Sequence, residues 1–173
     1  MKTTSKWHVL YVRSRWEKKV HERIQEAGVE SFLPIVKKVK TWSDRKKVVE
    51  EPLFKSYVFV NITSPMDFYK ALSVNGASAY VHFGRDYAVV RDCEIEQIKQ
   101  LLESNEILEI KTATELPEVG EYRKIICGAL SGLECEVIRA KSSNKILVRL
   151  ESIKQNLIAT IPSHYLEQIT LTA

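Results

Sequence analysis

Two short segments of this chain are apolar on both of their faces, and this feature constrains the fold most. Residues 7–12 and 57–62 are rich in β-branched and aromatic residues, which favours strands. Successive side chains of a strand point to opposite faces of a sheet. An antiparallel sheet with helices on one side normally exposes polar residues on the other. The second face must therefore be covered, either by core packing and loops or by another protein or domain that binds an exposed aromatic patch.

Helix signals alternate with these strands. Ser14-Arg15-Trp16-Glu17 has the form of a capping box, and Gly28 supplies a stop, which predicts a helix between them. Ser64-Pro65 and Asp92 predict the starts of two further helices. Extended segments are expected at 32–41 and 46–50 around a charged turn, and at 77–83 and 87–90 as a hairpin. Residues 1–106 therefore favour an α+β domain, an antiparallel sheet with helices packed on one face.

The pattern changes after residue 106. Residues 107–118 lack the spacing of apolar residues that is typical of a helix, and they resemble a linker. The remaining residues, 119–173, contain short apolar segments separated by Gly and polar turns. This regular spacing predicts a small β-barrel. The strands expected there are 122–127, 133–140, 145–150 and 156–161.

Composition excludes several classes of protein. The chain is 45% hydrophobic and 28% charged, as in ordinary globular proteins. No apolar run approaches the ~18 residues that span a bilayer, and no signal peptide is evident, so we expect a cytoplasmic protein without a membrane partner. Three cysteines without a C-x-x-C pair and four scattered histidines indicate neither a disulfide framework nor a metal site. Without a nucleophile elbow, P-loop or dinucleotide motif, we expect no enzyme and no cofactor.

The net charge of +4 is unevenly distributed. Residues 1–55 hold 14 Lys and Arg against 7 Asp and Glu, whereas residues 56–110 hold 4 against 8. One basic cluster surrounds the predicted hairpin tip at 37–47, and another belongs to the first strand and helix. A charge run is often only a solvated face. Cations beside aromatic rings also form phosphate contacts in nucleic-acid binding proteins, so both interpretations stay open.

Several motifs in order resemble the NusG family of transcription factors. They are Trp7-His8-Val9-Leu10-Tyr11, Glu51-Pro52-Leu53-Phe54 followed by Tyr57-Val58-Phe59-Val60, Val81-x-Phe83-Gly84, and a KOW-like stretch that contains Gly128, Leu130 and Gly132. The resemblance covers about residues 5–169 and looks closest to RfaH and the UpxY-type antiterminators of capsular polysaccharide operons. The chain departs from the family at Lys55-Ser56, where Pro-Gly is usual, and at Cys135, where a KOW glycine is usual.

The resemblance implies a NusG amino-terminal, ferredoxin-like domain at 1–106, a linker at 107–118 and an SH3-like KOW barrel at 119–173. It implies an elongation and antitermination factor, nucleoid-associated during transcription, that binds the clamp helices of bacterial RNA polymerase and suppresses pausing and termination. The polymerase-binding residues carried over by motif are Tyr11, Phe54, Tyr57, Phe83 and Ile98. Core packing is the alternative for Phe54 and Tyr57.

RfaH-like members also touch the non-template DNA strand. By position, the nucleic-acid-binding residues would be Arg13, Trp16, Lys19 and Arg23. The KOW motif residues Gly128, Leu130 and Gly132 resemble a segment that contacts ribosomal protein S10 or Rho in relatives. The β-branched tail favours a barrel rather than a helical masking hairpin as the resting state. The alternative function is a KOW-type ribosomal or RNA-binding protein.

Overall fold

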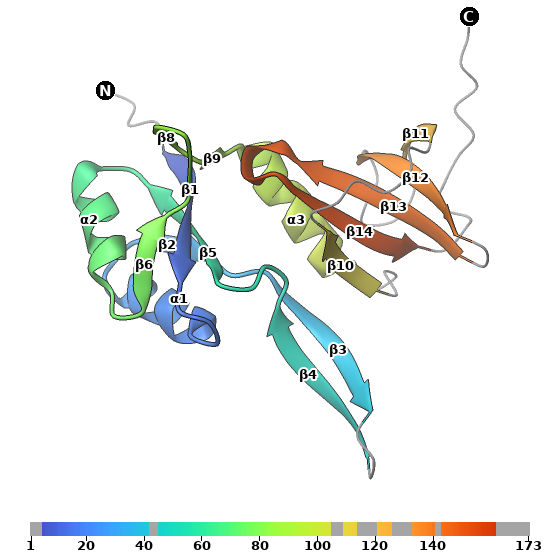
Figure 1. The fold of residues 1–173 in the computed structure, drawn as a ribbon, viewed down its shortest axis with the longest axis horizontal. Helices are drawn as coiled ribbons and strands as arrows, with labels where there is room; N and C mark the ends of the chain where they lie inside the picture. Colours follow the sequence, from blue (N-terminus) through green and yellow to red (C-terminus); the bar gives the residue numbers. More distant parts are fainter. Residues whose placement is uncertain are drawn as a thin grey trace, which may run out of the picture. The chain divides into compact units, whose positions relative to one another are not determined.

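The structure is a computed structural model of the 173-residue chain that describes residues 5–41, 45–104, 109–113, 121–125, 133–140 and 143–161. The chain divides into two compact units, Met1–Ile95 and Glu96–Ala173. Figure 1 labels most of the helices and strands of each unit. The domain boundaries expected near residues 106 and 118 stay predictions.

The first unit is built on an antiparallel sheet with the strand order β2-β5-β1-β6, and β9 also pairs with β1 (Figure 1). The two segments that are apolar on both faces are β1 and β5, and each pairs with neighbours on both of its sides. Pairing on both sides satisfies the edges of these strands, whereas two apolar faces require cover above and below the sheet. The strands are β1 (Lys6–Val12), β2 (Glu30–Phe32), β5 (Tyr57–Ile62), β6 (Ala77–Tyr80) and β9 (Val89–Val90).

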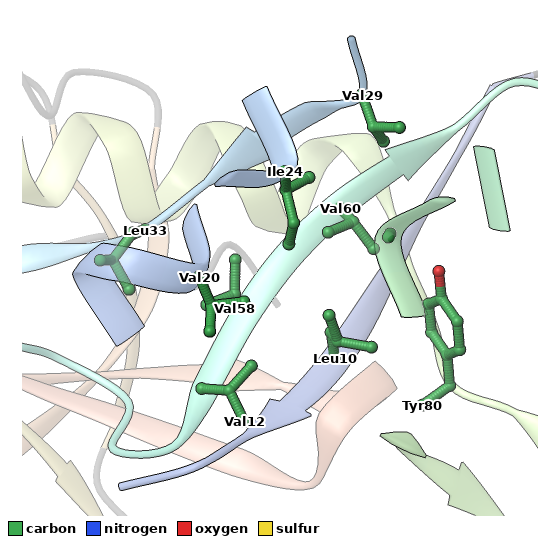
Figure 2. Packing of buried hydrophobic residues seen from close by; sticks show 10 residues of the cluster. Leu10, Val12, Val20, Ile24, Val29, Leu33, Val58, Val60 and Tyr80 are labelled. Carbon is green, nitrogen blue, oxygen red and sulfur yellow. The ribbon is translucent and has the colours of Figure 1, made fainter. Parts of the chain in front are cut away.

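Helices α1 (Glu17–Glu26) and α2 (Pro65–Ser73) supply the apolar residues that pack against one face of this sheet. Figure 2 shows Val20 and Ile24 of α1 beside the side chains of the two central strands. Ser64 caps α2, as expected, because its hydroxyl accepts the Asp67 N–H at 3.2 Å. The buried cluster comprises Leu10, Val12, Val20, Ile24, Val29, Leu33, Val58, Val60, Ala71 and Tyr80.

The opposite face of the central strands is also buried over most of its length. Trp7, Val9 and Phe59 are buried, and the Phe54 ring meets the Phe59 ring edge-on at 5.5 Å. Tyr11 differs, because its side chain is 49% exposed. The expectation that the second face is covered is therefore confirmed for the first three residues, whereas Tyr11 lies at the accessible end.

Two hairpins extend the first unit. Among the residues that the structure describes, strands β3 (Ile35–Thr41) and β4 (Lys46–Pro52) pair only with each other and form a two-stranded ribbon. Strands β7 (His82–Phe83) and β8 (Asp86–Tyr87) form the smaller hairpin. Its turn contains Gly84 at φ 65°, a left-handed conformation that glycine adopts at little cost.

The start of α1 differs from the capping-box prediction, which is wrong. The helix begins at Glu17, and Trp16 occupies the N-cap without a side-chain hydrogen bond. Ser14 and Arg15 form a turn in which Arg15 has φ 66°. The Trp16 N–H donates to the Arg13 carbonyl at 3.0 Å, and the Glu17 carboxylate accepts the buried N–H of Ser56 at 2.8 Å.

Helix α3 (Asp92–Glu103) crosses the division between the two units. Its apolar residues Ile95, Ile98 and Leu101 are buried, and Leu102 is half-buried. Across the described ranges, no helix is long and apolar enough to cross a membrane.

The second unit contains an antiparallel sheet with the strand order β10-β14-β13-β12-β11. Strand β10 lies inside the segment expected to be a linker, and it pairs with β14 along its full length. Among the described residues, β10 and β11 do not pair with each other, so the closed SH3-like barrel is not confirmed. The elements are β10 (Glu109–Ala113), β11 (Glu121–Lys124), β12 (Glu134–Ala140), β13 (Ser143–Leu150), the 3₁₀ turn η2 (Glu151–Ile153) and β14 (Gln155–Ile161).

Candidate functional site

Three cationic side chains surround the Trp16 indole. The distances to its ring centroid are 5.2 Å from Arg13 Cζ, 5.3 Å from Lys19 Nζ and 5.7 Å from Arg23 Cζ, all within cation–π range. Arg13 follows β1, whereas Lys19 and Arg23 project from successive turns of α1. The structure thus brings together all four residues expected to bind nucleic acid, and we call this group the Trp16 cluster.

The turn between α2 and β6 contacts the Trp16 cluster and holds two of its residues by hydrogen bonds. A Cβ added to Gly76 would lie 2.9 Å from Trp16 Cε3, so a larger residue would displace the indole. The Gly76 carbonyl accepts the Arg13 N–H at 2.9 Å, and the Asn75 carbonyl accepts Arg23 Nη1 at 3.0 Å. Sequence reasoning did not find this role of Asn75-Gly76. The Asn-Gly dipeptide signals a tight turn but not what the turn touches.

The positive charge of the Trp16 cluster lacks local compensation. Within the part of the chain that the structure describes, no carboxylate lies within ion-pair distance of Arg13, Lys19 or Arg23. Such a concentration of like charges attracts anions. The cluster can therefore bind the phosphates of a nucleic acid.

The β3–β4 ribbon, which carries the basic residues near 37–47, differs from the Trp16 cluster because carboxylates neutralise part of its charge. Lys40 donates to the carboxylate of Glu51, and this contact holds the pKa of Glu51 below its usual value. Glu50 of the same strand binds Lys18 of α1 at 3.1 Å. Lys38 is half-buried, and the other basic residues of the ribbon are exposed, namely Lys37, Arg45, Lys46 and Lys47.

Tyr11 and Tyr57 form an aromatic pair at the accessible end of the second sheet face. They are direct partners across β1 and β5, with ring centroids 6.0 Å apart and ring planes at 69°. Tyr11 is about half exposed, and Tyr57 is half-buried. Two of the five residues expected to bind polymerase are therefore in contact and accessible, as aromatic anchors of an interface must be.

The other three residues lie elsewhere. Phe54 is 3% exposed and packs against Phe59, which matches the core-packing alternative. Phe83 lies on the β7–β8 hairpin and is 40% exposed. Ile98 is fully buried on α3, in the second unit. Polymerase contact stays a prediction for all five residues.

One buried contact connects the Trp16 cluster with the aromatic pair. The Ser56 N–H donates to Glu17 Oε1 at 2.8 Å, and the Ser56 carbonyl accepts the Val12 N–H at 2.8 Å. Glu17 follows Trp16, and Ser56 precedes Tyr57. The turn that carries Tyr57 is thus fixed to the helix that carries the cations. Sequence reasoning missed this role of Glu17, because its local pattern matched a capping box.

Neither the expected KOW residues nor possible metal ligands add a site within the described part of the chain. Gly128, Leu130 and Gly132 lie outside the described residues. Among residues that the structure does describe, no three His, Cys, Asp or Glu side chains are grouped so as to hold a metal ion.

Comparisons with known proteins point to one family. The NusG family, described as transcription termination factor nusG, matches residues 5–99. A structure of Thermotoga maritima NusG that describes its domain interaction is 23% identical over 96% of this chain and 98% of that chain, with a TM-score of 0.57. At this identity the likeness concerns the fold alone. A chain of the MjSpt4:Spt5 complex is 16% identical over 93% of this chain and 96% of that chain, and its TM-score of 0.32 is too low to compare folds.

Proposed function

The chain belongs to the NusG family, whose members are transcription factors, and we propose that it is an elongation and antitermination factor that binds bacterial RNA polymerase. The proposed mechanism is binding without bond chemistry. A protein that bridges the polymerase cleft opposes opening of the clamp, so paused and terminating states become less populated. Such a factor acts in the cytoplasm, at the nucleoid.

The accessible pair of Tyr11 and Tyr57 carries the polymerase part of the proposal. Exposed aromatic rings at the end of a covered sheet face suit an apolar contact such as the clamp helices. Phe83, 40% exposed on its hairpin, stays a proposed further contact with polymerase. Phe54 supports the pair from the core, because its carbonyl accepts the Tyr57 N–H in the turn that leads to Tyr57. Polymerase contact by Ile98 is kept as a separate proposal that rests on the resemblance of its motif alone.

The Trp16 cluster carries the DNA part of the proposal. Its uncompensated cations suit phosphates of the non-template strand, and the indole suits stacking with a base. Recognition of that strand would restrict the factor to particular operons. We place it among the UpxY-type factors of capsular polysaccharide operons, on the motifs of its sequence.

We further propose that residues 119–173 form a KOW barrel that contacts ribosomal protein S10 or Rho. The antiparallel sheet of the second unit supports this proposal, because it supplies consecutive β11, β12, β13 and β14 in hairpin order. Gly128, Leu130 and Gly132 would lie between β11 and β12, where a KOW motif places its turn.

Binding to purified bacterial core polymerase tests the proposal. We expect Tyr11→Ala and Tyr57→Ala each to weaken binding by about thirtyfold, since truncation of an aromatic anchor costs about 2 kcal/mol. Tyr69→Ala is the control, because Tyr69 is 66% exposed on α2, away from the pair. Folded variants that bind as well as the control would contradict the site. Co-sedimentation with ribosomes but not polymerase would favour a ribosomal or RNA-binding protein.

A further inference from the structure

A cavity of 790 Å³ lies in the first unit between the start of α1 and the β3–β4 ribbon. It is distinct from the aromatic pair, because neither Tyr11 nor Tyr57 lines it. Five cationic side chains line it, namely Arg15, Lys18, Lys19, Lys40 and Lys55.

The three carboxylates of the cavity wall already have partners. Glu17 accepts the Ser56 N–H, Glu50 binds Lys18, and Glu51 binds Lys40. Arg15, Lys19 and Lys55 have no carboxylate within ion-pair distance among the described residues, and Lys55 acts on Glu51 only at longer range. Because Glu17 keeps its charge in a hydrogen bond to a neutral N–H, the lining holds five cations against three carboxylates, and this excess of two positive charges focuses positive potential in the concave space.

Lys19 connects this cavity with the Trp16 cluster. Its side chain lines the cavity, and its ammonium lies 5.3 Å from the Trp16 ring centroid. A nucleic-acid strand held at Trp16 would therefore have its next backbone groups at the cavity mouth. Adjacent phosphates need successive cations, and Arg15 and Lys55 continue the series that Lys19 begins.

The backbone of Arg15 supports a role for its side chain. Its φ of 66° lies in the left-handed region, which a residue with a Cβ adopts at an energetic cost and glycine does not. Strained residues of this kind often occur at ligand sites. Arg15 thus places a cation where a glycine would satisfy the fold better.

We infer that this cavity binds a phosphate group, and that its source is the backbone of a single-stranded nucleic acid held at the Trp16 cluster. The inference rests on the proposed nucleic-acid contact and extends it across the first turn of α1. A free nucleotide presents the same chemistry, and the experiment below separates the two sources.

The test measures fluorescence anisotropy of a labelled single-stranded oligonucleotide with the full chain over a series of salt concentrations. Each lost phosphate contact reduces the slope of log K against log salt by about 0.7. We expect this reduction in Arg15→Gly and in Lys55→Gln. Because Arg15 has a positive φ, which glycine adopts at little cost, we expect Arg15→Gly to stay folded. The control is Lys6→Gln, since Lys6 begins β1, about 20 Å from its other end; it should keep the wild-type slope.

Each result decides the inference. Wild-type slopes in both Arg15→Gly and Lys55→Gln would overturn the inference about the cavity. If Trp16→Ala still weakened oligonucleotide binding in that case, the proposed DNA contact at the Trp16 cluster would stand without the cavity. Binding of a nucleoside triphosphate that Arg15→Gly abolishes, with unchanged oligonucleotide slopes, would keep the phosphate site but overturn the strand as its source. Absence of any binding by the wild-type chain would overturn both, while polymerase binding through Tyr11 and Tyr57 would remain separately measurable.

Discussion

The carboxylate of Glu17 accepts the backbone N–H of Ser56 at 2.8 Å, between residues that lie 39 positions apart in the sequence. Both residues are buried. Glu17 begins the helix that carries Lys19 and Arg23, and Ser56 begins the strand turn that presents Tyr57. One hydrogen bond therefore supports both surfaces to which the proposed function assigns a partner.

Loss of this hydrogen bond should destabilise the chain. Glu17→Ala leaves the buried Ser56 N–H without its acceptor, and we expect the free energy of unfolding to fall by about 1–3 kcal/mol. Glu17→Gln keeps a neutral acceptor and should lose less. Urea denaturation measures the change, with Glu22→Ala at an exposed position of α1 as the control. Equal stability of Glu17→Ala and Glu22→Ala would show that the bond contributes nothing.

Ser56→Gly should have the opposite effect. Ser56 has φ 61°, a conformation that costs a residue with a Cβ about 1–2 kcal/mol. Glycine removes this cost, but its greater freedom in the unfolded chain offsets part of the gain in stability. We expect a net stabilisation of about 0.5–1 kcal/mol. Ser78→Gly, at an exposed position inside β6, should destabilise by a similar amount because its backbone is already extended. Two changes of the same sign would refute the strain at Ser56.

Stability should fall as the pH drops below about 6.5. Burial lowers the pKa of His8 and of His21 below the ordinary value of 6.5, so the unfolded chain binds protons that the folded chain does not. The stabilising contribution is therefore complete above pH 6.5 and is lost as the pH falls toward the folded pKa values. Proton NMR titration should give midpoints below 6.5 for both rings. His21→Gln should flatten the decline, and a decline that is steeper in this variant would contradict the assignment.

The acidic groups act in a lower window. Contacts with Lys40 lower the pKa of Glu51, and the hydroxyls of Thr63 and Ser64 lower that of Asp67. Their contributions are present above the ordinary carboxyl values and disappear as the pH falls below them. The loss between pH 7 and 5.5 therefore belongs to the histidines.

Two cysteines should differ in reactivity. Burial raises the pKa of Cys135 to about 11, whereas Cys93 is exposed. Because the thiolate is the reactive form, a thiol reagent at pH 8 should modify Cys93 quickly and Cys135 only after denaturant is added. A Cys127→Ser background removes the third thiol. Two rapidly modified thiols in the native chain would contradict the burial of Cys135.

Local patterns predicted much of the first unit. The segments of β1 and β5 were recognisable because they are rich in β-branched and aromatic residues, and the Ser64 cap of α2 depends only on neighbours in the sequence. Strand β10 was missed because five residues gain their order from β14, a partner far along the chain. The closure of the second sheet depends on such distant pairing too.

The site was predictable to the same extent. Arg13, Lys19 and Arg23 fall near Trp16 because one strand end and one helix face bring them together. Two contacts join segments that are distant in the sequence, and no local pattern indicates them. Gly76 leaves room for the Trp16 ring, and Glu17 accepts the N–H of Ser56. For Glu17 the local pattern even predicted a different partner.

Transcription by purified bacterial polymerase through a pause-rich leader and a terminator, with and without the full chain, tests the central claim most directly. The proposed mechanism predicts that the wild-type chain increases the fraction of full-length transcript, and that Tyr57→Ala does not while the Tyr69→Ala control does. An unchanged fraction with saturating wild-type chain, or an equal increase with folded Tyr57→Ala, would contradict an elongation factor that acts through the pair of Tyr11 and Tyr57.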